Sequence, residues 1–125
     1  MEFLDIDNIQ LFHKKIINKT GGSEGIRDIG LIESALNRAF VTFDGHELYE
    51  STEKKIAVIT HGLIRNHGFV DGNKRIGIAV MVLLLKMNNI IIKYSQQELI
   101  DVGLGVAEGK HDENYILEWI ESHEK

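Results

Sequence analysis

The sequence predicts an all-α protein, a bundle of about six helices around a buried central helix. Apolar residues recur at helical spacing along the whole chain of 125 residues, and no segment alternates strongly enough to require a sheet. Proline is absent, and no repeat, low-complexity stretch or linker divides the chain. We therefore expect a single domain over residues 1–125, a length that supports one hydrophobic core but not two.

The first two helices are expected in the N-terminal third. The apolar stripe of the first consists of Ile6, Ile9, Phe12, Ile16 and Ile17. Gly21 and Gly22 end this helix. The second helix is expected to begin after Asp28, a good N-cap residue, and its apolar residues are Leu31, Ile32, Ala35 and Leu36. The connection Phe40–Tyr49 contains the turn sequence Phe43-Asp44-Gly45 and can stay extended.

The third and fourth helices enclose a glycine-containing loop. Ser51 or Thr52 can cap the third helix, whose buried side is Ile56, Ile59, Leu63 and Ile64. This helix is expected to stop near His67. The fourth runs from about Asn73 to about Asn88, and every residue between Ile76 and Leu85 is apolar or glycine. We expect nearly the whole circumference of this helix to be buried, which makes it the predicted central helix.

The C-terminal part predicts two more helices. Ile90-Ile91-Ile92 is a short β-branched run that can lie extended against the bundle. Ser95 and Glu98 have the spacing of a capping box and open a fifth helix. Asp112 can cap the last helix, which presents Ile116, Trp119 and Ile120 to the core.

Composition excludes several classes of function. The formal charge is -5 and the pI about 5.6, so the chain has no general electrostatic attraction for nucleic acid. The absence of cysteine excludes disulfides, thiolate metal sites and a cysteine nucleophile. The first residues do not form a secretory signal, and the most apolar stretch is too short to span a bilayer. We expect a cytoplasmic protein without a membrane or nucleic-acid partner.

The segment between the third and fourth helices is suited to a nucleoside triphosphate. Gly72, directly before a helix, lets the backbone approach a phosphate without a Cβ in the way. Lys74 and Arg75 each cost roughly 0.3–1 kcal/mol in a first helical turn, which indicates a bound anion. Asp71 is placed to coordinate magnesium, a hard cation that prefers oxygen ligands. His67, a residue type with a pKa of about 6.5, is suited to proton transfer at neutral pH.

Each of these residues has an ordinary explanation when taken alone. A histidine at a helix end is commonly a cap or surface group, Asp-Gly is a common turn, and a Lys-Arg pair is usually solvated. Asn73 adds neutral donors, and Phe69 is most simply an anchor in the core. The prediction of a function therefore depends on the combination, which lies directly before the most apolar helix.

The segment His67-x-Phe69-x-Asp71-Gly72-Asn73-Lys74-Arg75 resembles the signature of the Fic family, HxFx(D/E)GN(G/K)R. Lysine after the asparagine is similar to the death-on-curing (Doc) branch of that family. Further similarities to this branch are Gly21-Gly22, Gly25, Arg27-Asp28, Gly30-Leu31, Ala35 and Ala107-x-Gly109. The resemblance covers nearly the whole chain and implies a Fic-fold helical bundle.

The resemblance also implies a role for each matched position. His67 would be the catalytic base that deprotonates a target hydroxyl, and Asp71 would bind Mg²⁺. The phosphates of ATP would be bound by Arg65, Gly72, Asn73, Lys74 and Arg75. Arg65 is also favourable simply as a cation in the last turn of a helix. The connection Phe40–Tyr49 matches a flap that helps to dock the target segment.

The function implied is that of a toxin of a type II toxin–antitoxin system. It would be an ATP-dependent protein phosphotransferase that phosphorylates a hydroxyl of elongation factor Tu and so arrests translation, and a Phd-like antitoxin would restrain it. Lys74 and Ile78 favour this reaction, since adenylylating members usually have glycine and a second arginine at these positions. Ala79 replaces an asparagine of the bacteriophage-type member, which removes one polar contact to the nucleotide.

Other interpretations stay open. The chain can be a Fic-type adenylyltransferase, or a non-catalytic antitoxin-binding regulatory module, although the latter needs no base such as His67. A phosphohydrolase metal site would use His46, His61, His67 and His111, which lack the neighbouring His-Asp pairs of such sites. The segment Thr20–Gly25 also matches the pattern (S/T)xxxE(G/N) of self-inhibited Fic proteins. Its three glycines predict a loop rather than the helix that this pattern requires.

Overall fold

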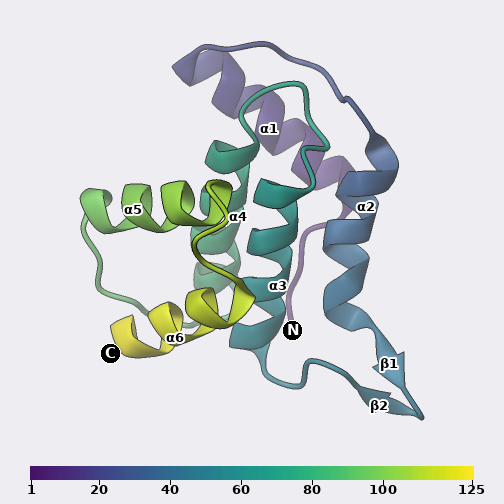
Figure 1. Cartoon of the computed structure of the whole chain (residues 1–125), viewed down its shortest axis with the longest axis vertical. Helices are drawn as coiled ribbons and strands as arrows, with labels where there is room; N and C mark the ends of the chain where they lie inside the picture. Colours follow the sequence, from purple (N-terminus) through teal and green to yellow (C-terminus); the bar gives the residue numbers. More distant parts are fainter.

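The computed structural model describes all residues, 1–125, and is helical apart from one short hairpin (Figure 1). The elements in chain order are α1 (Ile6–Thr20), α2 (Ile29–Asn37), the 3-10 helix η1 (Arg38–Phe40), β1 (Thr42–Phe43), β2 (His46–Glu47), α3 (Thr52–Arg65), α4 (Asn73–Met87), α5 (Gln96–Ala107) and α6 (Glu113–His123). The predicted all-α class is confirmed. None of these helices combines the length and the apolar character that crossing a bilayer requires.

Five of the six α-helices begin at a side chain that caps them. In each case the side chain accepts an N–H from the first turn; the five N-caps are Asp5, Asp28, Ser51, Ser95 and Asp112. The capping box predicted at the start of α5 is present. Helix α4 is the exception, because its N-cap is Gly72 and no side chain bonds its first turn. The first N–H groups of α4 therefore remain open to another acceptor.

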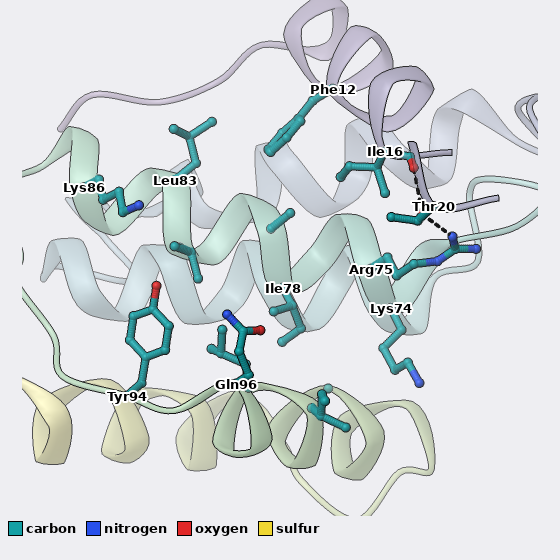
Figure 2. A pocket seen from close by; sticks show the side chains of 15 residues that line it. Phe12, Ile16, Thr20, Lys74, Arg75, Ile78, Leu83, Lys86, Tyr94 and Gln96 are labelled. Carbon is teal, nitrogen blue, oxygen red and sulfur yellow. Dashed lines mark hydrogen bonds between the residues drawn. The ribbon is translucent and has the colours of Figure 1, made fainter. Parts of the chain in front are cut away.

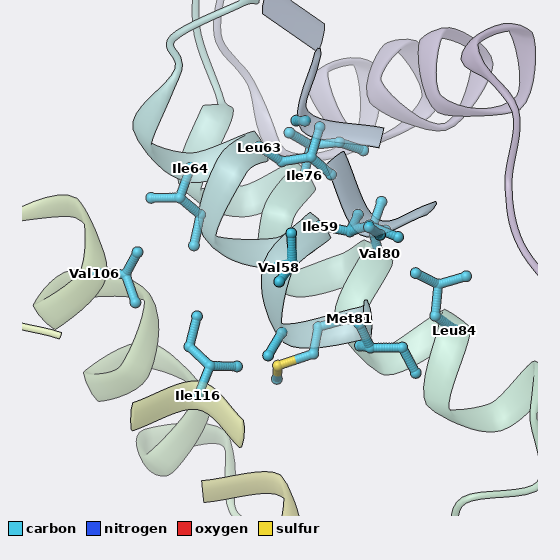
Figure 3. Packing of buried hydrophobic residues seen from close by; sticks show 14 of the residues in the cluster. Val58, Ile59, Leu63, Ile64, Ile76, Val80, Met81, Leu84, Val106 and Ile116 are labelled. Carbon is cyan, nitrogen blue, oxygen red and sulfur yellow. The ribbon is translucent and has the colours of Figure 1, made fainter. Parts of the chain in front are cut away.

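The core lies between α3 and the helices around it. Helix α3 is in contact with α2, α4, α5 and α6, and its residues from Lys55 to Ile64 are buried with the single exception of His61. Figure 3 shows its side chains among those of α4, together with Val106 of α5 and Ile116 of α6. A buried central helix is thus present, but it is α3 rather than α4.

The prediction that α4 is buried around nearly its whole circumference is wrong. One side packs on α3, whereas Ile78, Ala79, Val82 and Leu83 are only half-buried. Helices α1 and α5 lie on either side of this second face and do not meet over it, so a groove stays open along α4. One side of the uninterrupted apolar run of α4 therefore packs in the core, and the other side lines an open groove.

The predicted extended connection is a β-hairpin, in which Thr42 pairs with Glu47 and Phe43 with His46. Asp44 and Gly45 both have positive φ, of 52° and 78°, which suits a two-residue hairpin turn. Helix α3, about 21 Å long for its 14 residues, separates the hairpin from the loop after Arg65. Figure 1 shows the hairpin beyond the opposite end of α3 from that loop. The expected role of this connection as a flap that helps to dock the target segment stays a prediction.

Candidate active site

The predicted residues from His67 to Arg75 come together around one hollow of about 450 Å³. Its lining consists of Ile64, His67, Val70, Asp71, Gly72, Asn73, Lys74, Arg75 and Ala107. The lining comes from the end of α3, the following loop, the first turn of α4 and the last residue of α5. Residues of the loop and first turn dominate it, so the hollow is centred on the start of α4.

The N-terminus of α4 offers unpaired backbone donors to this hollow. Gly72 has φ 77° and ψ 19°, a left-handed conformation that favours glycine. A Cβ at this position would lie 2.9 Å from Cδ1 of Ile17, so the end of that side chain would have to shift. The first intrahelical bond runs from the N–H of Ile76 to the carbonyl of Gly72. The main-chain N–H groups of residues 73–75 therefore have no acceptor in the helix, and the helix dipole adds positive potential there.

His67 has an unusual backbone conformation for a residue with a side chain. Its φ is 51°, in the left-handed region, which costs of the order of 1–3 kcal/mol. This conformation follows the end of α3 and turns the chain inward, so that Phe69 is only 2% exposed. Gly68 is buried against Ile32, which a Cβ would approach to 2.3 Å. The side chain of His67 itself stays exposed in the hollow.

Asp71 is held as a carboxylate. The pKa of Asp71 lies below its ordinary value, chiefly because the backbone N–H of Ser23 donates to Oδ2 at 3.1 Å. The N–H of Gly72 donates to Oδ1 at 2.7 Å, and Arg75 lies 3.6 Å away as an ion pair. The side chain is half-exposed and lines the hollow, so an oxygen-preferring cation can reach it.

The metal expected at Asp71 fits a shared site rather than a protein cage. No group of three or more histidine, cysteine, aspartate or glutamate side chains is assembled for a metal ion. Magnesium is commonly held by one or two carboxylates together with substrate phosphates and water, which suits a single aspartate beside an anion site. The alternative phosphohydrolase built on four histidines therefore has no ligand set.

Arg75 reaches back to the end of α1. Its Nη1 donates to Oγ1 of Thr20 and to the carbonyl oxygen of Gly21, both at 2.6 Å. Figure 2 shows the bond to Thr20 at one end of the groove along α4, with Lys74 leaving the same helical turn in another direction. Lys74 is exposed and Arg75 is half-buried, and both cations line the hollow.

Asn73 and Arg65 have structural partners that the sequence did not indicate. The amide of Asn73 brackets Phe69, accepting from its N–H at 3.0 Å and donating to its carbonyl at 3.1 Å. Asn73 thus fixes the loop, and its main-chain N–H remains as an unpaired donor. Arg65 does not line the hollow; its Nη1 donates at 2.9 Å to the carbonyl of Ala107, the last residue of α5. A contact of Arg65 with phosphate stays a prediction.

His13 is a residue of the site that the sequence reasoning missed. It is 3% exposed, its ring stacks on Phe69 at 3.8 Å between centroids, and its Nε2 lies 2.7 Å from the carbonyl oxygen of Asp71. His13 therefore joins α1 to the loop between α3 and α4. A signal was present, because His13 lies four residues after Ile9 and four before Ile17, within the buried stripe of α1.

The segment after α1 is also part of the site. The predicted loop is confirmed for residues 21–25, and the carbonyl of Gly25 accepts from the N–H of Val70 at 3.1 Å. Ile26 and Phe69 form an isolated antiparallel bridge. Glu24 lines a separate hollow on the side of His13, not the hollow of Arg75. Although this segment matches the self-inhibitory pattern, its glutamate, Glu24, does not line the hollow that Arg75 lines.

Comparison with known proteins gives two findings. The model of the Fic/DOC family matches residues 3–85, which include α1 to α3, α4 except its last two residues, and the whole candidate site apart from Ala107. The chain is 37% identical over 70 residues to "Toxin Doc" of Mycolicibacterium smegmatis, a match that covers 56% of this chain and 54% of that protein. The match thus spans about half the length of this curated relative.

Proposed function

This chain belongs to the Fic/DOC family, and from that premise we propose that it is the toxin of a type II toxin–antitoxin pair. Its activity is transfer of the γ-phosphoryl group of ATP to a hydroxyl of elongation factor Tu, which arrests translation in the bacterial cytoplasm. Support comes from the similarity to a protein named Toxin Doc and from the residues around the hollow.

One observation carries this proposal. The uncapped N-terminus of α4, an ionised Asp71 and the cations Lys74 and Arg75 border the same hollow as an exposed His67. Phosphoryl transfer requires little covalent chemistry from the protein, since most of the catalysis is positioning and charge stabilisation. Open N–H donors and two cations supply the charge stabilisation, the carboxylate would hold a metal cation, and one imidazole supplies a base.

In the proposed reaction, the hydroxyl of the target attacks the γ-phosphorus. His67 takes the hydroxyl proton, the new P–O bond forms, and the bond to the β,γ-bridging oxygen breaks, so that ADP leaves. The N–H groups at the start of α4 and the side chains of Lys74 and Arg75 stabilise the phosphate oxygens. Asp71 would hold Mg²⁺, which supplies neutralisation of phosphate charge when bound. Asn73 and His13 keep the loop in place.

The residues around the hollow favour phosphoryl over adenylyl transfer. Ile78, at the position where adenylylating members usually carry a second arginine, lines the apolar groove of α4 and not the hollow. The hollow is therefore lined by two cations, Lys74 and Arg75. An orientation that puts the α-phosphate beside His67 would leave the outer phosphates without that second arginine.

The restraining antitoxin has a suitable surface in the groove of α4. The groove has a volume of about 530 Å³ and lies between α1 and α5, with Ile16, Ile78 and Val82 among its apolar lining residues. Lys86 lies at one end and Lys74 and Arg75 at the other (Figure 2). We propose that an amphipathic segment of a Phd-like antitoxin, acidic at its ends, occupies this groove and reaches two cations of the hollow.

A labelling experiment tests the proposed reaction. The purified protein is incubated with elongation factor Tu and with ATP labelled at the γ- or the α-phosphate, and label on elongation factor Tu is measured. We expect transfer from the γ-position, reduced about 100-fold or more in His67→Ala. The matched control Glu24→Ala, at the separate hollow, should retain full activity. Transfer from the α-position instead supports adenylylation, and no transfer from either refutes the proposed activity.

A further inference from the structure

The carbonyl groups around His67 are bound by a side chain that the mechanism above does not use. The guanidinium of Arg27 donates through Nε to the carbonyl oxygen of His67 at 2.7 Å. Its Nη2 donates to the carbonyl oxygen of Asn66 at 3.3 Å. One planar group thus bridges two consecutive carbonyls at the point where α3 ends.

These two carbonyls belong to the two peptide planes on either side of the Cα of His67. Each peptide unit is rigid, so the orientations of these planes determine φ and ψ of His67. A fork of N–H donors with fixed geometry therefore restrains both dihedral angles at once. This restraint acts on the residue with φ 51°, a conformation that needs support from its surroundings.

The backbone on which Arg27 is carried is itself attached to the loop. The N–H groups of Arg27 and Asp28 both donate to the carbonyl of Gly68, at 2.8 Å and 2.9 Å. Residues 27 and 28 therefore contact three consecutive carbonyls, those of residues 66, 67 and 68. We call these contacts of residues 27 and 28 with the three carbonyls the backbone clamp. Asp28 is also the N-cap of α2, so the backbone clamp is attached to a helix.

From this geometry we propose that Arg27 is a positioning residue for His67. It holds the backbone of His67 in the left-handed conformation and so directs the imidazole into the hollow where the target hydroxyl is deprotonated. The inference rests on the proposed phosphotransferase function, in which His67 is the base. Arg27 acts through His67 and touches neither the nucleotide nor the transferred group.

A purely structural role predicts a different result from a positioning role. The side chain of Arg27 is exposed, and water can replace it at the two carbonyls, so its loss should change stability little. The groups that hold the nucleotide lie on α4 and in the residue 71–72 turn, which Arg27 does not contact. A positioning residue should therefore affect turnover without affecting nucleotide binding.

The test compares Arg27→Ala and Arg27→Lys with Lys14→Ala, an exposed cation of α1 without a contact to the loop. For Arg27→Ala we expect kcat to fall about 10- to 100-fold, since small misplacements of a catalytic group have effects of this size. The KM for ATP, the Kd for ATP–Mg²⁺ and the thermal midpoint should stay at wild-type values. Arg27→Lys, which keeps one donor, should recover part of kcat, and Lys14→Ala should match wild type.

A second measurement on the same variants does not depend on turnover. The backbone φ of His67 is followed by the NMR coupling between its amide and α protons, and we expect the positive-φ value to be lost in Arg27→Ala. The proposal is wrong if kcat or this coupling is unchanged in that variant, or if kcat, KM and the thermal midpoint change together. If wild type transfers no phosphoryl group but the coupling responds, the proposed function fails and the backbone clamp is confirmed.

Discussion

Asp71 is the residue at which the three parts of the site meet. Its carboxylate binds the N–H of Ser23 from the segment after α1, its carbonyl is bound by His13 of α1, and it precedes the N-cap of α4. The side chain of Asp71 thus offers a carboxylate to a cation and also binds the segment after α1, and both contacts depend on its negative charge. The contact with α1 itself is made by the main-chain carbonyl.

The charge of Asp71 predicts a pH dependence at this residue. Its pKa is lowered in the folded state, so the ionised form favours folding above the ordinary pKa of an aspartate. This contribution is lost as the pH falls through the folded-state pKa. We expect a carboxyl ¹³C titration of Asp71 with a midpoint below that of a model aspartate. The amide proton of Ser23 should shift with the same midpoint.

A matched variant identifies the titrating group. In Asp71→Asn the amide of residue 23 should show no titration in that acidic range, whereas Asp101→Asn, an exposed change on α5, should leave it as in wild type. A midpoint for Asp71 at or above the model value contradicts the arrangement of N–H donors around its carboxylate.

At the scale of the elements, α4 contributes to two different surfaces, the hollow at its first turn and the groove along its length. Its first turn presents open N–H groups and two cations to the hollow. Its exposed apolar face, with Ile78, Val82 and Leu83, forms the floor of the groove between α1 and α5. Because both surfaces belong to one helix, a partner in the groove would lie next to Lys74 and Arg75 without having to enter the hollow.

A substitution in the groove should separate inhibition by the antitoxin from phosphoryl transfer. Val82→Glu places a carboxylate in an apolar surface that the antitoxin segment would cover, where an unpaired charge is costly. We expect binding of a Phd-like antitoxin to weaken about 100-fold or more, with phosphoryl transfer retained because Val82 is outside the hollow. Isothermal titration calorimetry and the labelling assay measure the two effects.

The control for this variant is Leu104→Glu on α5. Leu104 is an exposed leucine that does not line the groove, so the same change there should leave antitoxin binding intact. Equal binding by wild type and Val82→Glu would place the antitoxin on another surface.

At the scale of the whole molecule, the fold depends on close approach of α3 and α4. Gly77 of α4 faces Ile64 of α3, and a Cβ at position 77 would lie 2.4 Å from Cγ1 of that isoleucine. Both residues are almost fully buried, and the added Cβ would also lie 3.3 Å from the carbonyl oxygen of Thr60 on α3. The two helices that flank the candidate site are thus held at a distance that only glycine permits.

Gly77→Ala should therefore destabilise the protein. Overpacking of a core costs about 1–3 kcal/mol, which exceeds the gain of roughly 1 kcal/mol in helix propensity from glycine to alanine. Denaturant unfolding gives the free energy. Gly103→Ala, where the Cβ would meet the half-exposed Ile78 at 3.0 Å, is the matched control and should be nearly neutral. Equal stability of the two variants would show that α3 and α4 can separate without cost.

Local signals in the sequence predicted most helix boundaries and the loop. Asp28, Ser51, Ser95 and Asp112 are N-caps as expected, because capping depends on residues within one helical turn. Gly72 and its neighbours were identified because an uncapped, cationic helix start is unfavourable without an anion. The sequence determined the helical class and most residues of the hollow, although Arg65 lies outside it and Ile64 and Ala107 were not predicted.

Tertiary structure alone decided which surfaces those helices bury and what the loop residues contact. The apolar run of α4 predicts burial but does not distinguish a core from an open groove, since that depends on where α1 and α5 pack. Asp71, Arg75 and His67 are contacted by Ser23, Thr20 and Arg27, about 40 to 55 residues earlier in the chain. Such pairings leave no local pattern, because they arise only when α1 and α2 dock on the loop.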